Sequence, residues 1–335
     1  MRSKLIINLA NLQHNYLHCA KLSNNVGAVV KADAYGLGAV KVSLALNQVG
    51  CRDFFIATIQ EGKQIRQHLD MQNKIYILNS VSSSELMDVK AYNLTPVCSQ
   101  IDDIKFCLQQ NIPFLVQIDT GLCRLGLNEE ELHEIELLLN SLNDVLLEGF
   151  LTQFIDSDIY DHKTISQITI INRIKERFST KKVSIANTGG LDHGCAMDIS
   201  RIGRGLYGSC NADSILKDKL KPVINLKAQI LQIKHIKANQ GISYQHKFIS
   251  SRPMRVGVVS IGYADGLPYN LPFALGKVGM DLTMFEVDQA ARVGDWFDII
   301  TDEYKLDDIA NSCELNPRYI LVCLGNASRL EKFYT

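Results

Sequence analysis

The residue with the clearest chemical promise in this 335-residue chain is a lysine at the end of an apolar run. Lys31 follows two valines and opens the string Lys-Ala-Asp-Ala-Tyr-Gly-Leu-Gly over residues 31–38. An amine that is partly desolvated in a pocket has a lowered pKa and can attack an aldehyde. Gly36 and Gly38 allow a tight turn before the next helix. A lone lysine at such a position is more often a surface residue, so the neighbouring strings matter.

Two further strings contain arginine. Residues 118–126 read Ile-Asp-Thr-Gly-Leu-Cys-Arg-Leu-Gly and contain Arg124, and residues 201–208 read Arg-Ile-Gly-Arg-Gly-Leu-Tyr-Gly. The guanidinium group is planar and permanently charged, so it suits bidentate binding of a carboxylate. Taken alone, an arginine on such a loop is as readily an ordinary surface residue.

Hydrophobic periodicity predicts the elements that position these residues. Predicted strands cover Gly27–Val30, Phe54–Thr58, Lys74–Leu78, Leu94–Cys98, Phe114–Asp119, Leu146–Phe154, Val183–Ala186 and Gly203–Tyr207. Predicted helices cover Val40–Val49, Glu61–Leu69, Ser82–Tyr92, Ile101–Gln109, Glu129–Leu142 and Ile165–Phe178, with only a short helical signal in the Gly-rich stretch Thr188–Met197. Eight strands and their helices over roughly 200 residues indicate a (β/α)₈ barrel of the TIM type, whose chemistry lies where the strands end.

The pattern of apolar and polar residues changes after about Gly208. Segments rich in Val and Ile follow, at Val223–Ile236, Arg255–Ile261, Met284–Val287 and Trp296–Ile300, with a short helix near Leu306–Asn311. We therefore predict a barrel over residues 1–215 and a mostly β C-terminal domain over residues 216–335. One continuous doubly wound sheet is the alternative, and the lack of long helices in the tail argues against it.

Composition bounds the class of protein. Apolar residues make up 46% of the chain, charged residues 21%, and the net charge is -1, as in globular proteins that do not bind nucleic acid through its phosphates. The longest apolar runs are too short to cross a membrane, and we find no signal peptide. Nine scattered cysteines without a CxxC pair argue against a disulfide framework or a metal site. We expect a cytoplasmic protein.

The string around Lys31 closely resembles the cofactor-lysine segment of the alanine racemase family. Asp33 stands where the family usually has Asn, and Leu37 where it usually has His. The resemblance implies that Lys31 holds pyridoxal 5'-phosphate as a Schiff base. It also implies that the Tyr35 hydroxyl reaches the cofactor phosphate.

The resemblance continues through the remainder of the barrel. The string around Arg124 is similar to the family's D-T-G-x-x-R-L-G segment, so Arg124 is implied to bind the substrate carboxylate and the phenolic oxygen of the cofactor. Thr188 takes the place of a phosphate-binding serine. Arg201 is implied to face the pyridine nitrogen, and the backbone N–H groups of Gly203 and Arg204 to bind phosphate. Since arginine cannot accept a proton, the ring nitrogen would stay neutral, which favours racemisation over side reactions.

Three strings of the second domain also match. They surround Tyr244, the unchanged Gly-Tyr-Ala-Asp-Gly of residues 262–266, and Met280 with Asp281. The resemblance implies a homodimer in which Tyr244, Met280 and Asp281 complete the active site of the partner subunit. Racemisation removes the Cα proton on one face and returns it on the other, so Lys31 and Tyr244 would be the two bases. The implied reaction interconverts L- and D-alanine and supplies D-alanine for peptidoglycan.

Four residues depart from the family. Gln117 replaces a lysine that is often carbamylated, and it could hydrogen-bond Arg124 without neutralising it. Gln153 replaces a histidine that stacks on the cofactor ring, and Gly279 replaces a cysteine, which should widen the site. Tyr319 only loosely matches a phosphate ligand and size gate.

These departures leave three alternatives open. A racemase of another amino acid, such as serine or a basic amino acid, stays within the family. A decarboxylase of the related barrel fold is a second alternative, but those enzymes are longer and have a Cys-containing motif that the tail lacks. A carrier of pyridoxal phosphate is the third, and the β domain with Tyr244 argues against it.

Overall fold

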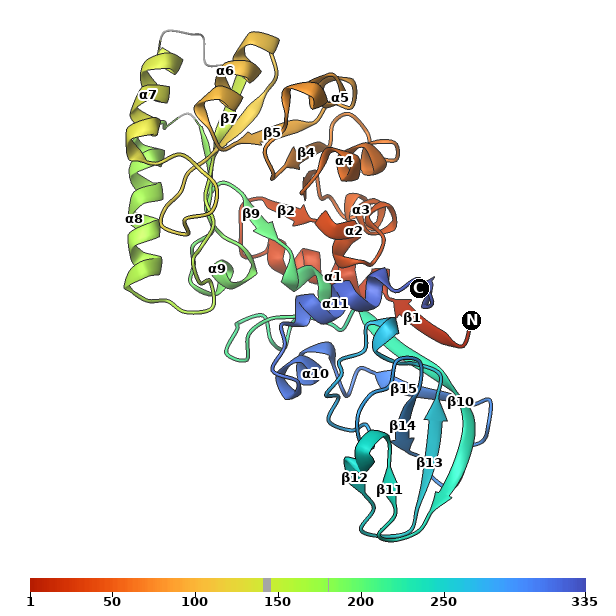
Figure 1. The fold of residues 1–335 in the computed structure, drawn as a ribbon. Helices are drawn as coiled ribbons and strands as arrows, with labels where there is room; N and C mark the ends of the chain where they lie inside the picture. The colour runs from red at the N-terminus through yellow and green to blue at the C-terminus, as the bar shows by residue number, and fades with distance from the viewer. Residues whose placement is uncertain (141–145, 180) are drawn as a thin grey trace. The chain divides into compact units, whose positions relative to one another are not determined.

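The computed structural model describes residues 1–140, 146–179 and 181–335 (Figure 1). By their contacts these residues form two units. The barrel unit contains Leu12–Ala34 and Ala39–Lys221. The C-terminal unit contains Met1–Asn11, Tyr35–Gly38 and Pro222–Thr335. The boundary expected between residues 215 and 216 stays a prediction.

Eight parallel strands form the nearly closed barrel, which confirms the predicted (β/α)₈ fold. They are β2 (Val26–Val29), β3 (Asp53–Ile56), β4 (Lys74–Ile77), β5 (Thr95–Cys98), β6 (Phe114–Gln117), β7 (Leu147–Leu151), β8 (Lys182–Ser184) and β9 (Ser200–Ile202). Their order in the sheet is β8-β7-β6-β5-β4-β3-β2-β9. The Arg201 amide donates to the Ala186 carbonyl over 2.9 Å, which links β9 to the segment after β8. Parallel strands buried on both faces read as short apolar runs, which is why periodicity found most of them.

Helices alternate with the barrel strands along the chain, with α1 before β2 and η3 after β9 (Figure 1). They are α1 (Leu9–Ala20), α2 (Lys31–Tyr35), α3 (Ala39–Gln48), α4 (Ile59–Arg66), α5 (Leu86–Ala91), α6 (Ile101–Gln110), α7 (Glu129–Asn140), α8 (His162–Arg177) and α9 (Thr188–Asp192), with 3-10 turns η1 (Ser83–Glu85) and η3 (Arg204–Tyr207). The start of α4 is an example of a helix whose first residue is fixed by the sequence, since Thr58 and Glu61 form a reciprocal capping box. The last two residues of the helix predicted over Glu129–Leu142 lie outside the described residues.

The strand predicted over Gly203–Tyr207 is wrong. The last barrel strand is β9, three residues earlier, and residues 204–207 form η3. Leu206 and Tyr207 are large and buried, so in the sequence they have the pattern of a strand end. Gly205 lets the chain turn close to Thr188, because a Cβ there would lie 2.9 Å from the Thr188 Cγ2 atom. Gly208, with φ of 81°, ends the turn in the left-handed region.

A left-handed turn follows Lys31 directly. Ala32, Asp33, Ala34 and Tyr35 all have φ between 53° and 57°. Each such residue costs about 1–2 kcal/mol. Hydrogen bonds offset this cost: the Ala32 amide donates to Glu61 Oε1 over 2.7 Å, and Asp33 Oδ1 accepts from the Ala39 amide over 2.7 Å. Backbone strain of this kind is concentrated at functional sites, and here it lies next to the candidate catalytic lysine.

Ala32→Gly is expected to stabilise the protein by about 0.5–1 kcal/mol, because glycine adopts positive φ without a Cβ clash. The thermal midpoint should rise by about 1–3 °C. Ala91→Gly is the matched control, since Ala91 is also exposed but ends the right-handed helix α5. It should lower the midpoint. Equal falls in both variants would contradict the left-handed turn at residue 32.

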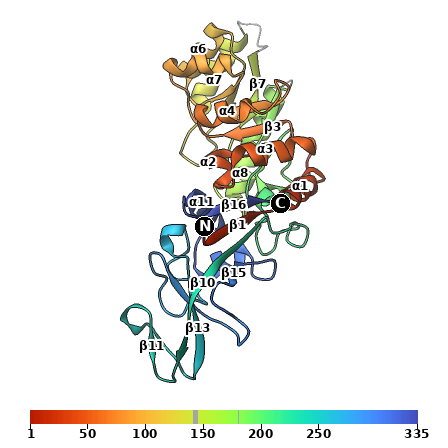
Figure 2. The same cartoon turned by 90° about the vertical axis from the view of Figure 1, so that its right-hand side faces the viewer.

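The C-terminal unit is mostly β, as predicted. Its strands are β1 (Ser3–Ile7), β10 (Ile224–Ile236), β11 (Gly241–Ile242), β12 (Phe248–Ile249), β13 (Met254–Val259), β14 (Thr283–Glu286), β15 (Trp296–Ile300) and β16 (Glu331–Tyr334). One sheet has the order β14-β13-β10-β1-β16, and β15 also pairs with β10. Figure 2 shows β10 and β13 side by side. The 3-10 turns η4 (Tyr244–His246) and η5 (Tyr263–Asp265) interrupt the strands.

Two helices complete the C-terminal unit. α10 (Leu306–Ser312) matches the short helix predicted from the sequence, but α11 (Pro317–Asn326) was not predicted. Its start carries an ordinary signal: the Asn316 side chain caps the helix by accepting from the Arg318 amide, and Pro317 takes the first turn. The apolar residues Ile320–Leu324 are largely the buried face of this helix.

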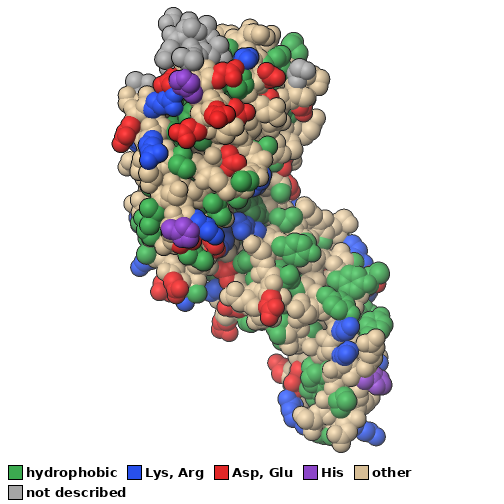
Figure 3. Space-filling model, turned by 60° about the vertical axis from the view of Figure 1, so that its left-hand side comes forward, with side chains coloured by type: hydrophobic (Ala, Val, Ile, Leu, Met, Phe, Trp, Pro, Cys, Tyr) green, Lys and Arg blue, Asp and Glu red, His purple; other side chains and the backbone are tan. Residues whose placement is uncertain are grey.

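Charged side chains of both signs are interspersed on the face shown in Figure 3, in keeping with a net charge of -1. Within the described ranges, no helix is long and apolar enough to span a membrane.

Candidate active site

Polar side chains of the barrel unit gather where its strands end. Lys31 directly follows Val30 after β2 and is half-buried, and Gln117 is the last residue of β6. Thr152 and Gln153 follow β7, and Ser184 ends β8. Since all eight strands are parallel, these ends lie at one face of the barrel, the face at which barrel enzymes place their chemistry.

Arg201 is a buried cation in the middle of β9. Its Nη1 donates to Ser184 Oγ and its Nη2 donates to the Thr152 carbonyl. Ser184 Oγ in turn donates to the Ile199 carbonyl over 2.7 Å. Burial, together with the positive charge of Arg124, lowers the pKa of the Arg201 guanidinium to about 10. Two nearby guanidiniums favour binding of an anion.

Arg124 is presented by a closed loop after β6. Ile118 and Leu127 form a β-bridge, and Asp119 Oδ1 accepts from the amides of Gly121 and Cys123 over 2.9 and 3.1 Å. The Arg124 side chain is exposed. Because the two ends of the loop are bonded to each other, the loop holds the Arg124 guanidinium near Arg201 without burying it.

Gln117 fixes the same loop rather than the guanidinium of Arg124. Its Nε2 donates to the Leu125 carbonyl over 2.9 Å, and its side chain is buried. The sequence suggested a hydrogen bond to Arg124, whereas the structure places this one on the neighbouring backbone. The neutral amide therefore leaves the charges of Arg124 and Arg201 undiminished.

A second part of the site joins α9 to η3. Thr188 Oγ1 accepts from the Gly205 amide over 3.0 Å, and Thr188 is buried. Asn187 caps α9 by accepting from the Gly190 amide over 3.1 Å. The first N–H groups of a helical turn have no partner inside it, so the start of η3 at Gly203 and Arg204 offers donors. The structure thus brings Thr188, Gly203 and Arg204 together, and their phosphate-binding role stays a prediction.

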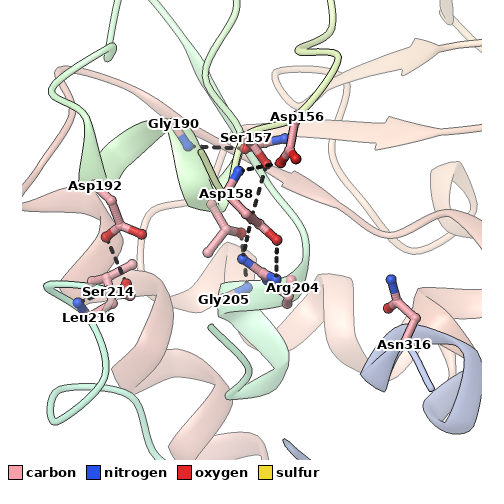
Figure 4. Close-up of polar contacts among 12 residues, drawn as sticks. Asp156, Ser157, Asp158, Gly190, Asp192, Arg204, Gly205, Ser214, Leu216 and Asn316 are labelled. Carbon is pink, nitrogen blue, oxygen red and sulfur yellow. Dashed lines mark hydrogen bonds and ion pairs between the residues drawn. The ribbon is translucent and has the colours of Figure 1, made fainter. Parts of the chain in front are cut away.

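The Arg204 side chain is occupied elsewhere. Its Nη1 and Nη2 contact the Asp158 carboxylate at 3.3 and 3.0 Å, and Figure 4 shows the two groups facing each other. Burial would raise the pKa of Asp158, but a hydrogen bond from Asn211 and the charge of Arg204 lower it overall. The pair fastens the segment after β7 to η3, so only the backbone of Arg204 is left for the predicted role.

The sequence did not predict Asp158, Ser184 or Thr152 as parts of the site. Asp158 lies in an acidic run that reads as solvent-exposed, and Ser184 and Thr152 read as ordinary strand-end residues. Their partners are 17 to 49 residues away in the chain. No local signal could have found them.

The C-terminal unit contains the other predicted residues, Tyr35, Tyr244 and Met280. Tyr244 opens η4 and is 70% exposed, and Met280 is 54% exposed. Tyr244 lies between Ser243 and Gln245, which have φ of 64° and 57°. Tyr244 is thus exposed on a strained turn of its own unit.

Gly279 and Tyr244 lie close together within this unit. A Cβ at Gly279 would stand 3.7 Å from the Tyr244 ring, and 2.6 Å from the Leu282 carbonyl oxygen. The turn at residues 279–282 is therefore too tight for a side chain at position 279 without a shift of the backbone. Tyr319, on α11, is exposed, and a hydrogen bond with the Cys323 thiol raises the pKa of Tyr319.

The Gly-Tyr-Ala-Asp-Gly string supports the loop that carries Met280. Buried Asp265 accepts from the Gly262 amide over 2.9 Å and pairs with Arg329 Nε at 2.8 Å. Arg329 also pairs with Asp281, next to Met280. The Met280 carbonyl accepts from the Ala264 amide over 3.1 Å. Residues 262–266 therefore have a structural role, which is to hold Met280 and Asp281 in place.

Fold and site together define a barrel enzyme with a lysine after one strand, a buried arginine in another, and a second arginine near it. The family model for the alanine racemase N-terminal domain matches residues 7–211, and the one for the C-terminal domain matches residues 223–334. The chain belongs to the alanine racemase family, as its sequence motifs suggested.

Individual relatives agree over nearly the full chain. A catabolic alanine racemase of Agrobacterium fabrum is 31% identical over 97% of this chain and 90% of its own length. Alanine racemase 3 of Salmonella typhi is 31% identical, over 96% and 93%. The crystal structure of alanine racemase from Bartonella henselae with covalently bound pyridoxal phosphate superposes with a TM-score of 0.89 at 28% identity, and 100% of both chains is covered.

Proposed function

We propose that this protein racemises alanine, with pyridoxal 5'-phosphate held by Lys31. The observation that carries the proposal is the buried Arg201 in β9 of a barrel whose β2 ends next to Lys31. Among the described residues, no carboxylate forms an ion pair with Arg201. A buried cation without an acidic partner is costly, so a negatively charged cofactor and substrate would compensate it.

The residues present fit that cofactor. Lys31 supplies an amine for its aldehyde, and Thr188 with the amides of Gly203 and Arg204 supplies donors for its phosphate. Gly205 allows the close approach of Thr188 that assembles this cradle. Arg201 would face the ring nitrogen, and Tyr35 would reach the phosphate.

Each proposed role follows from side-chain chemistry. When bound, the cofactor delocalises the negative charge that develops at the substrate Cα atom. Arg124 holds the substrate carboxylate with its planar fork. The Lys31 amine removes or returns the Cα proton on one face, and Tyr244 of the partner subunit does so on the other. Arg201 cannot take a proton, so it keeps the ring nitrogen neutral, which favours quick return of the proton.

The proposal extends to assembly and cellular role. It requires a homodimer, since the exposed Tyr244 and Met280 would complete the site of the partner. We propose that the enzyme works in the cytoplasm, where its nine free thiols stay reduced. D-Alanine for peptidoglycan would be its product.

The test is a chiral assay of the purified protein with pyridoxal 5'-phosphate and single L-amino acids. With L-alanine, D-alanine should rise until the enantiomers are equal, because they have the same free energy in water. Serine, lysine and arginine form the comparison panel. Turnover of one of these without turnover of alanine would overturn the assignment in favour of another racemase, and the changed residues Gln153 and Gly279 would then mark its specificity. Release of carbon dioxide would indicate a decarboxylase instead.

A further inference from the structure

A fully buried amide lies behind Arg201 and the loop that contains Arg124. Gln167 lies on α8, and its side chain is 0% exposed. Its Nε2 donates to Thr120 Oγ1 over 2.7 Å and to the Gln153 carbonyl over 3.0 Å. Its Oε1 accepts from the Ile155 amide over 2.9 Å. A buried polar network that is fully satisfied makes its surroundings rigid.

The network leads from Gln167 to Arg201 through two threonines, Thr120 and Thr152. Thr120 Oγ1 lies 2.8 Å from Thr152 Oγ1, and the Thr152 carbonyl accepts from Arg201 Nη2. Thr120 also belongs to the loop that presents Arg124. One side chain on α8 therefore connects the segments after β6 and β7 and, through Thr152, the Arg201 guanidinium.

The partners of Gln167 demand an amide. An amide offers two N–H donors and one carbonyl acceptor, and all three contacts match that pattern. Because Thr120 Oγ1 accepts from Gln167, its own proton can be donated to Thr152 Oγ1. A glutamate would place a carboxylate oxygen against the Gln153 carbonyl. A methionine of similar size would remove the hydrogen bonds to the Gln153 carbonyl and the Ile155 amide, and would leave Thr120 Oγ1 with Thr152 alone.

We propose that Gln167 is a positioning residue that sets the orientation of Arg201 toward the cofactor ring. This inference rests on the proposed function. If Gln167 is lost, the Thr152 amide keeps its hydrogen bond to the Ser184 carbonyl, but the Thr120 hydroxyl that contacts Thr152 Oγ1 loses a partner. The Thr152 carbonyl and the guanidinium that donates to it can then shift. A displacement of about 1 Å at a reacting centre can cost about a hundredfold in rate. A shifted guanidinium would also admit water to the ring nitrogen.

The test compares Gln167→Met with the wild-type holoenzyme. We expect kcat to fall about 10- to 100-fold with a smaller change in KM. The pH dependence of the visible absorbance of the bound cofactor should also change, because that absorbance band responds to the group that faces the ring nitrogen. In a cycle with Arg201→Lys, the Gln167→Met substitution should cost less than it does in the wild type.

Controls separate positioning from general stability. Asn73 is a buried amide that donates to Asn47 Oδ1 over 2.7 Å just before β4, at the opposite end of the barrel. Asn73→Leu should lower the thermal midpoint and leave kcat and the cofactor band unchanged. Should Gln167→Met fail to fold, the pair Thr120→Val and Thr120→Ser decides. The valine should reproduce the defect and the serine should restore wild-type behaviour.

Two results would overturn the inference. One is a folded Gln167→Met protein with wild-type kcat and an unchanged band. The other is a double variant, Gln167→Met with Arg201→Lys, whose fold-loss in kcat equals the product of the two single losses. A wild-type protein that binds no pyridoxal phosphate would overturn the proposed function itself, and the wild-type spectrum alone reveals that case.

Discussion

Replacing Lys31 with alanine is expected to lower the rate of alanine racemisation by about 10³-fold or more. The substitution removes the amine that holds the cofactor and, with it, one of the two groups that move the Cα proton. The visible absorbance of the bound cofactor should disappear. Chiral analysis of the product and a spectrum of the dialysed protein measure both effects.

Covalent attachment can be assigned independently of activity. Borohydride reduces the link between lysine and cofactor, and peptide mapping by mass spectrometry should then place the added mass on Lys31. Lys41→Ala is the matched control, because Lys41 is exposed on α3, the helix that follows the turn. It should retain the band and the activity. A visible band that persists in Lys31→Ala would refute the attachment at this residue.

Most barrel strands could be predicted because burial on both faces leaves a short apolar run. The run predicted at Phe54–Thr58 corresponds to β3 at Asp53–Ile56, and the one at Lys74–Leu78 to β4. Strand β9 could not be found in this way, because its middle residue is Arg201. A buried charge in a strand breaks the local pattern, and such breaks occur where function overrides folding preference.

Contacts between residues far apart in the sequence explain why strand β1 and the role of Gln167 were not predicted. Strand β1 is only five residues long, and its partner β10 begins more than two hundred residues later. Gln167 sits in a polar stretch of α8 that reads as a solvent-facing surface, yet its partners come from the segments after β6 and β7. Such contacts depend on the closed barrel, so they become visible only in three dimensions.

Mixing two impaired variants, Lys31→Ala and Tyr244→Phe, is expected to restore activity. If each site takes Lys31 from one subunit and Tyr244 from the other, a heterodimer of these variants has one site with both substitutions and one with neither. Random pairing makes half of the dimers heterodimers, so about a quarter of wild-type activity should return. Subunits are exchanged by co-refolding, or co-expressed with two tags and purified in tandem.

The reciprocal mixture distinguishes shared sites from sites within one chain. A heterodimer of the wild type with the double variant Lys31→Ala/Tyr244→Phe has no intact site if the two residues come from different subunits, because each site lacks one of them. If both come from the same chain, that heterodimer keeps one intact site, and the first mixture recovers nothing. The exposure of Tyr244, at 70%, favours the shared arrangement, since a catalytic tyrosine needs exclusion from water that its own unit does not supply. Activity in the reciprocal heterodimer would therefore remove the partner subunit from the mechanism and return Tyr244 to its own chain.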